Sequence, residues 1–109
     1  MGYNFDRAYY RLVYPIALRP TFRTGGHAYP VVDLSEEGLR LLCPDGARPD
    51  LETELAGLIV LRGADAVAVE GRVVRVDPPF VSLRLSRGVP FGVMLEQQRF
   101  LTHRLIGWR

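Results

Sequence analysis

Apolar and polar residues alternate along much of this chain, at the two-residue period of a β-strand. The alternation is clearest at 80–86, where Val81, Leu83 and Leu85 are separated by serine and arginine. Successive side chains of a strand point to opposite faces, so this spacing presents one apolar face to a core. Turns rich in glycine or proline separate such runs at short intervals. The pattern predicts many short antiparallel strands.

Six or seven strands are expected before residue 96. The first, 13–23, contains Pro15 and Pro20 and is predicted to be an irregular edge strand, because each proline removes a ladder donor. Gly25-Gly26 favours a tight hairpin after it. Gly71 interrupts the alternation of a later strand and predicts a bulge or a sharp bend. The other strands are expected at 27–34, 39–43, 54–61, 66–76, 80–86 and 91–95, with 47–53 as a loop or one helical turn.

The hydrophobic period changes near the end of the chain. Phe100, Leu101, Leu105 and Ile106 fall on one side of a helix, and Trp108 extends that side. The residues expected on its polar side are Gln97, Gln98, Arg99, His103 and Arg104. An amphipathic helix needs an apolar surface to cover, and the open mouth of a barrel is a natural one. The expected fold is therefore all-β with one helix: a six- or seven-stranded antiparallel β-barrel at 13–95, followed by a C-terminal α-helix at 96–107.

Length and composition favour one globular domain over 1–109. The chain has 109 residues and is 48% hydrophobic, which argues against disorder. No apolar run approaches the roughly 20 residues that span a bilayer, and the first residues lack the apolar core of a secretory signal. Cys43 is the single cysteine, which is consistent with a reducing compartment, and its apolar run predicts a small buried residue. We expect a cytoplasmic protein without membrane insertion.

The positive charge of the chain comes from arginine alone. All 14 basic residues are arginine, and the net charge is only +2. Such usage is typical of proteins encoded by GC-rich genomes. Where geometry allows, however, a guanidinium group can engage phosphate oxygens, or the O6 and N7 acceptors of guanine, through two parallel hydrogen bonds. Arg7 and Arg11 are the two arginines for which the sequence supports that interpretation.

Two short motifs carry the main functional signal. Arg7-Ala-Tyr-Tyr-Arg11 lies near the start, and Asp33-Leu-Ser-Glu-Glu-Gly38 follows the first hairpin. In this order they resemble the RxxxR and (D/N)xSxxG signature of PilZ domains, which bind the bacterial second messenger cyclic di-GMP. The resemblance implies that both arginines contact phosphate and guanine. The ligand-binding residues implied are Arg7, Arg11, Asp33, Ser35 and Gly38.

Softer similarities extend over nearly the whole chain. Gly38-Leu-Arg-Leu, Gly71-Arg-Val-Val-Arg-Val and Phe91-Gly-Val-Met-Leu resemble later strands of the family, and the expected barrel with its helix resembles the PilZ fold. Asp6 departs from the family pattern, which often has a basic residue before the first arginine. A carboxylate at this position can pair with Arg7 or Arg11 and weaken phosphate binding. The number of ligands bound, one or a stacked pair, stays open.

The side chains of the second motif suit a guanine nucleotide. The carboxylate of Asp33 can accept from guanine N1–H and N2–H together. Ser35 offers a hydroxyl to a phosphate or base edge, or stabilises its own turn. Gly38 permits a positive backbone angle or a close approach of ligand to backbone.

A conformational switch follows from this arrangement. We expect residues 1–12 to be a flexible ligand-clamp segment that becomes ordered when cyclic di-GMP binds, changing the contact with an unidentified protein partner. The protein is expected to be a monomer or a weak homodimer.

The sequence leaves three alternatives to weigh against a cyclic di-GMP receptor. A PilZ-like adaptor would act through protein contacts and bind no nucleotide. A single-stranded nucleic-acid binder would stack bases on aromatic side chains, namely Tyr9, Tyr10, Tyr14, Phe22 and Tyr29, but the small net charge argues against DNA or RNA. An enzyme is disfavoured because the sequence offers no set of nucleophile, base and orienting group. No catalytic residue, metal site or cofactor is expected.

Overall fold

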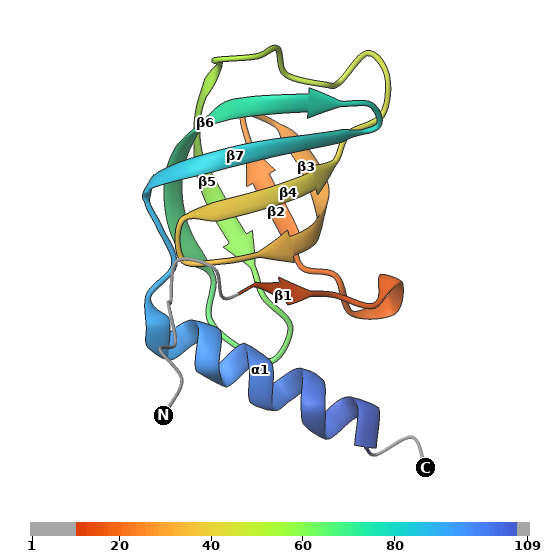
Figure 1. Cartoon of the computed structure of the whole chain (residues 1–109), viewed down its shortest axis with the longest axis vertical. Coiled ribbons are helices and arrows are strands. Elements are labelled where there is room, and N and C mark those ends of the chain that lie inside the picture. The colour runs from red at the N-terminus through yellow and green to blue at the C-terminus, as the bar shows by residue number, and fades with distance from the viewer. Residues whose placement is uncertain (1–10, 107–109) are drawn as a thin grey trace, which may run out of the picture.

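The computed structural model describes residues 11–106, which form seven strands, a 3₁₀ turn and one long helix. Figure 1 shows the strands wrapped into a barrel with the helix at one end. The strands are β1 (Leu12–Val13), β2 (Thr21–Thr24), β3 (His27–Leu34), β4 (Gly38–Leu42), β5 (Glu54–Val60), β6 (Val67–Asp77) and β7 (Phe80–Arg87), followed by α1 (Phe91–Ile106).

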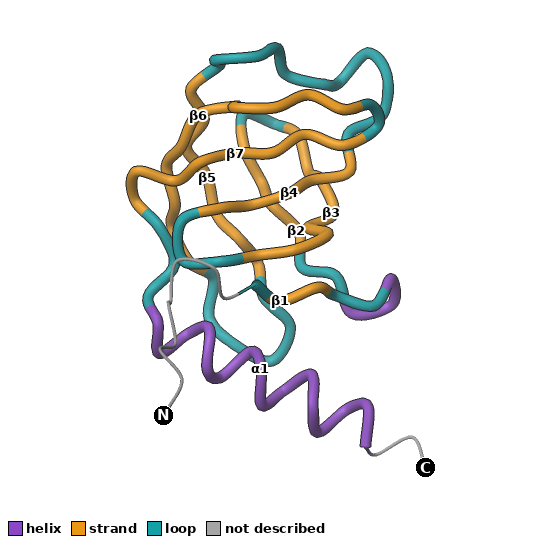
Figure 2. The backbone as a smooth tube through the Cα atoms, in the orientation of Figure 1, coloured by secondary structure: helices purple, strands orange, loops and turns teal. Residues whose placement is uncertain are grey.

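The sheet closes on itself. Its strand order is β1-β3-β2-β5-β6-β7-β4, and a further pairing of β3 with β4 joins the two sides. Strands β2 to β7 thus form a closed six-stranded antiparallel barrel, with β1 added to β3 (Figure 2). Closure removes the unpaired edges that an open sheet of this size would expose. The predicted all-β barrel followed by one helix is confirmed.

Strand β3 changes partners along its length. Its first half pairs with β2, and its second half pairs with β4 and, at the end, with β1. The register to β4 shifts between Val31 and Asp33, which marks a bulge. Because of this change of partners, Asp33 lies between β1 and β4 at the end of the strand.

The predicted edge strand at 13–23 is wrong as a continuous element. It is divided into β1, a 3₁₀ turn at Ile16–Leu18 and β2. Pro15 precedes the 3₁₀ turn and Pro20 precedes β2, so each proline stands where pairing stops. β1 also begins at Leu12, inside the segment assigned to a flexible clamp.

Glycines form the predicted hairpin and the predicted strand irregularity. Gly25 and Gly26 have φ values of 53° and 84° and join β2 to β3, as in a tight two-residue hairpin. The register between β6 and β7 shifts at Gly71, which confirms the predicted irregularity. A Cβ atom at Gly71 would approach the Arg84 carbonyl oxygen to 2.5 Å, so glycine lets these two strands lie close together.

The barrel interior is apolar and fully enclosed. Side chains from each of the six barrel strands contribute to it, including Phe22, Val31, Leu41, Ile59, Val73 and Val81, all at 0% exposure. The cluster continues through Tyr14, Leu18 and Cys43 toward the ends of the barrel. Burial of this apolar area is the main stabilising contribution to such a fold.

The C-terminal helix begins five residues earlier than predicted. Residues 91–95, expected as the last strand, form the first turns of α1, and the backbone N–H groups of Val93 and Met94 donate to the Pro90 carbonyl. A short apolar run does not distinguish a strand from a buried helical segment, which explains the error. The barrel therefore ends at Arg87 rather than at residue 95.

The helix covers the end of the barrel with a face that includes a polar residue. Met94, Gln97 and Leu101 are buried at helical spacing, although Gln97 was expected on the polar side. The Tyr14 hydroxyl donates to Gln97 Oε1 at 2.8 Å, and Gln97 Nε2 donates to the Arg62 carbonyl at 3.4 Å. One amide thus connects α1 to the segment after β1 and to the β5–β6 connection. Within residues 11–106 no helix is both long and apolar enough to span a membrane.

Candidate functional site

The centre of the candidate site is a buried carboxylate between two arginines. Asp33, at the end of β3, is 6% exposed. Its Oδ1 lies 3.8 Å from Arg11 Nη1, and its Oδ2 lies 3.8 Å from Arg40 Nη1. Both distances are ion-pair separations, longer than a hydrogen bond. Val13 and Arg40 are the Cα partners of Asp33 on β1 and β4, so the strand register produces this juxtaposition.

The protonation of Asp33 reflects two opposing effects. Burial raises the pKa of its carboxyl above the ordinary 3.8, because desolvation disfavours the charged form. The guanidinium groups of Arg11 and Arg40 lower the pKa in opposition, and burial outweighs them. Both arginines therefore favour the charged carboxylate and oppose part of the effect of its burial.

Arg40 is held more firmly than Arg11. The centre of its guanidinium group lies 4.4 Å from the ring centroid of Phe80, a stacking distance for a cation and an aromatic face. The Arg40 side chain is 38% exposed, whereas that of Arg11 is 60% exposed. Arg11 is therefore the less constrained of the two partners of Asp33.

Ser35 and Gly38 are the two ends of the turn that follows Asp33. The Ser35 amide donates to the Gly38 carbonyl at 2.9 Å, while the Ser35 Oγ–Gly38 O distance of 3.5 Å leaves the hydroxyl weakly held. The φ angle of Gly38 is not in the left-handed region. A Cβ atom at Gly38 would approach Ser35 Oγ to 3.1 Å, so the glycine keeps the space beside the serine open.

The turn is hydrogen-bonded to the chain that leads into α1. The Leu85 amide donates to the Glu37 carbonyl at 2.8 Å, and the Val89 amide donates to the Glu36 carbonyl at 3.0 Å. A Cβ atom at Gly88 would overlap the Glu36 carbonyl oxygen. The turn and the start of the helix are therefore parts of one tightly packed unit.

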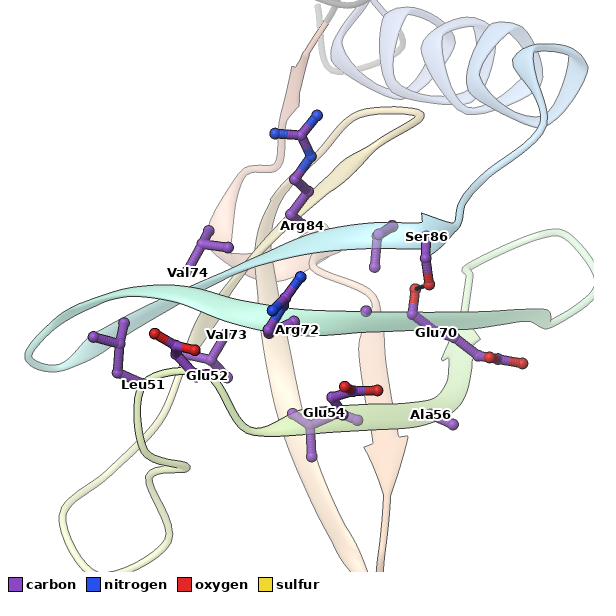
Figure 3. Close-up of a pocket in the computed structure, with 13 residues that line it drawn as sticks. Leu51, Glu52, Glu54, Ala56, Glu70, Arg72, Val73, Val74, Arg84 and Ser86 are labelled. Carbon is purple, nitrogen blue, oxygen red and sulfur yellow. Dashed lines mark hydrogen bonds between the residues drawn. The ribbon is translucent and has the colours of Figure 1, made fainter.

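A groove begins one strand away from this turn. It has a volume of about 660 Å³ and runs over the outer face of β5, β6 and β7 (Figure 3). Arg84, the Cα partner of Gly38, lines it together with Arg72 on β6. The groove therefore begins at the strand that pairs with Gly38 of the second motif.

The structure brings together four of the five predicted ligand-binding residues. Arg11 contacts Asp33, and Ser35 contacts Gly38, both at the same end of β3. Arg7 lies outside the described residues, as does Asp6, so their placement stays a prediction.

Arg40 pairs with Asp33 but is not among the residues that the two motifs predict. A signal for it was present, since it stands two positions after Gly38 and strand alternation puts both on one face. The pairing of Arg40 with Asp33 could not be predicted from the sequence, because it depends on the register shift in β3. Sequence periodicity does not reveal such a shift.

Several residues named for other functions lie in the core. Tyr14, Phe22 and Tyr29 are at most 4% exposed and present no face for stacking bases. Cys43 is also buried, as predicted, and burial raises the pKa of its thiol to about 11, so it is protonated at neutral pH. Within the part of the chain that the structure describes, no cluster of three or more histidine, cysteine or acidic residues is arranged to hold a metal ion.

Comparison with known proteins agrees with the fold and with the motifs. The family model of the PilZ domain matches residues 5–105. Among solved structures, that of the Bacillus subtilis inhibitor of motility, MotI/DgrA, is similar with a TM-score of 0.65 and 18% identity. The alignment covers 97% of this chain and 54% of that one, so this chain spans about half of its length. No curated protein matches the sequence. With a family model matched over nearly its whole length and a barrel of the same fold, this chain belongs to the PilZ domain family.

Proposed function

We propose that this protein is a receptor for cyclic di-GMP that signals to a protein partner. The observation that supports this most directly is the convergence of Asp33, Arg11, Ser35 and Gly38 at one end of β3. Coincidental motif matches have no reason to meet in space. The site combines a buried carboxylate, guanidinium groups and a weakly held hydroxyl. These groups can bind the N–H donors, the phosphates and the base edges of a guanine nucleotide.

Each residue has a distinct role in the proposed complex. Asp33 accepts from guanine N1–H and N2–H, and Ser35 donates to phosphate or a base edge. Arg11, with Arg7, moves onto phosphate and guanine. Gly38 leaves room for close approach, which its open surroundings support better than a need for positive φ. The ligand is bound and released unchanged, so the protein needs no catalytic group, metal or cofactor.

The proposed output is a change in protein contacts near the site. Residues 1–12 close over the ligand, which rearranges the surface beside β1. Val13, the Cα partner of Asp33, is 67% exposed, and Ile16 is 80% exposed. Exposed apolar side chains beside a ligand site are suited to contact a protein partner. In this proposal the receptor is a monomer or a weak homodimer in the cytoplasm.

The same exposed residues support one alternative. A PilZ-like adaptor that binds no nucleotide would use Val13 and Ile16 for a constitutive contact. The arginines around Asp33 would then serve only to compensate a buried charge.

Titration of cyclic di-GMP separates the two functions. The wild type is expected to bind, while Arg7→Ala, Arg11→Ala and Asp33→Ala each weaken binding by about tenfold or more, since a charged hydrogen bond contributes about 1.5–3 kcal/mol. The absence of wild-type binding at tens of micromolar (about 10–100 µM, corresponding to roughly −6 kcal/mol) would favour the adaptor. Equal competition by GMP or GTP would show that the proposed clamp is wrong.

Amide exchange tests the conformational switch. Residues 1–12 are expected to gain protection when cyclic di-GMP is added, because ordering slows exchange. Equal protection with and without the ligand would contradict the switch and leave the receptor function intact.

A further inference from the structure

Two arginines outside both motifs lie in one row with Gly38. Gly38 on β4 is the Cα partner of Arg84 on β7, which is in turn the partner of Arg72 on β6. Adjacent strands are about 4.8 Å apart, which places Arg72 roughly 10 Å from Gly38 along the outer surface. Directly paired residues of neighbouring strands point to the same face. The row therefore leads from the second motif into the groove.

Arg72 and Arg84 lie directly opposite each other, so each guanidinium group has a like charge as its cross-strand neighbour. Neither group has an acidic partner within ion-pair distance among residues 11–106. Like charges directly opposite in a sheet destabilise it. Other exposed arginines of the same strands are compensated: Arg75 pairs with Asp77, and Arg87 pairs with Glu70. Glu54 on β5 is the Cα partner of Arg72, but it forms no ion pair with it. Two guanidinium groups that no ion pair holds are suited to a ligand that carries acceptor atoms.

The groove supplies further chemistry beside the pair. Figure 3 shows Arg72 and Arg84 directed to the same side of their strands, with Glu54 on the neighbouring β5. Leu51 and Val74 contribute apolar side chains to the wall of the groove. Guanine presents two acceptors, O6 and N7, on one edge and N–H donors on the next. An arginine pair followed by a glutamate matches that order of acceptors and donors.

We propose that Arg72 and Arg84 form a guanine subsite that extends the candidate site across the outer face of β7 and β6. This inference rests on the proposed function, because it assigns a second contact region to the same ligand. One guanine lies at Asp33 and Ser35, and the other enters the groove, where the arginines donate to O6 and N7. Glu54 accepts from the donor edge of that second base.

The experiment is a titration of cyclic di-GMP, with cyclic di-AMP as the comparison ligand. The variants are Arg72→Ala, Arg84→Ala and their combination, with Arg75→Ala as the matched control on β6. The combined variant is expected to lose about tenfold or more in affinity for cyclic di-GMP, while the control changes less than about twofold. The preference for cyclic di-GMP over cyclic di-AMP is expected to fall as well, because adenine offers a donor where guanine has O6.

Thermal unfolding accompanies the titration. Removing the opposed like charges, singly or together, is expected to leave the melting temperature unchanged or raise it, so weaker binding will not reflect loss of the fold. Wild-type binding with the combined variant equal to the control would overturn the guanine subsite alone. Equal losses for both dinucleotides would also overturn it, since they would indicate a phosphate contact. If the wild type binds no cyclic di-GMP, the proposed function fails and the subsite with it.

Discussion

Asp33 is the residue on which the candidate site depends most. Its carboxylate is desolvated, and burial raises its pKa, while Arg11 and Arg40 act against that rise. A carboxylate that accepts two hydrogen bonds from guanine must be ionised. By lowering the pKa of Asp33, the two arginines favour that ionised form before a ligand arrives. When Arg11 moves to the ligand in the proposed complex, Arg40 is the opposing charge that remains beside Asp33.

Arg40→Ala is predicted to make cyclic di-GMP binding more sensitive to acid. Removing the guanidinium group raises the pKa of Asp33 further, and the carboxylate loses its acceptor role as the pH falls through that pKa. Affinity measured from about pH 7 down to about pH 5 should therefore fall earlier than in the wild type. Arg40→Lys should largely restore the profile. An unchanged profile in Arg40→Ala would show that Arg40 does not control the charge of Asp33.

At the scale of elements, the turn at 35–38 links the barrel to the helix. Its carbonyl groups accept from Leu85 near the end of β7 and from Val89 in the connection to α1, and Gly88 packs against Glu36. In the proposed complex, a shift of the turn would therefore be transmitted directly to the connection that leads into the helix. Strand β3 positions the other part of the candidate site. Its first half pairs with β2 and its second half with β4 and β1, so Asp33 lies at the end of the barrel.

Gly88→Ala is predicted to destabilise the fold and to weaken ligand binding. The added methyl group meets a backbone carbonyl oxygen, which cannot rotate away, so overpacking should cost about 1–3 kcal/mol. Chemical unfolding measures the loss, and titration of cyclic di-GMP measures the effect on the turn.

Gly92→Ala is the matched control for that variant. A Cβ atom at Gly92, in the first turn of α1, meets nothing within 4 Å, so alanine there should stabilise the helix by up to about 1 kcal/mol. If both variants unfold alike and bind alike, the contact between Gly88 and Glu36 is not important for the turn.

At the scale of the whole molecule, the distribution of charge disfavours nucleic acid as a partner. The net charge of +2 results from 14 arginines and 12 acidic residues, and the exposed Arg75 and Arg87 are each paired with a carboxylate. Three aromatic side chains considered for base stacking are instead in the core. Among residues 11–106, exposed arginines without an ion pair lie on several different elements, including Arg23 on β2, Arg84 on β7 and Arg99 on α1. Single-stranded nucleic acid is usually bound along one continuous basic groove, which differs from this scattered arrangement.

A single-stranded oligonucleotide is predicted not to bind at physiological salt. Few phosphate contacts release few counterions, so affinity should be weak and nearly independent of salt. A fluorescently labelled oligothymidine at about 0.15 M salt tests this by anisotropy. Binding that weakens steeply as salt is raised would restore the nucleic-acid interpretation.

Local patterns were sufficient for the class of fold and for most of its elements. Strand alternation identified β4 to β7 within one or two residues, and the paired glycines located the first hairpin, because both signals depend only on nearby residues. They failed at residues 91–95, where an apolar run has no distinguishing period, and at Gln97, whose burial depends on a partner at Tyr14, far away in the chain.

The motifs named Asp33, Ser35 and Gly38 from sequence alone, since their spacing is a property of one short turn. The pairing of Asp33 with Arg40, and the row that Arg84 and Arg72 form with Gly38, required the folded barrel. Those contacts arise from a register shift in β3 and from the neighbours that closure gives to β7. Register is set by the packing of whole strands against one another, and no local stretch of residues encodes it.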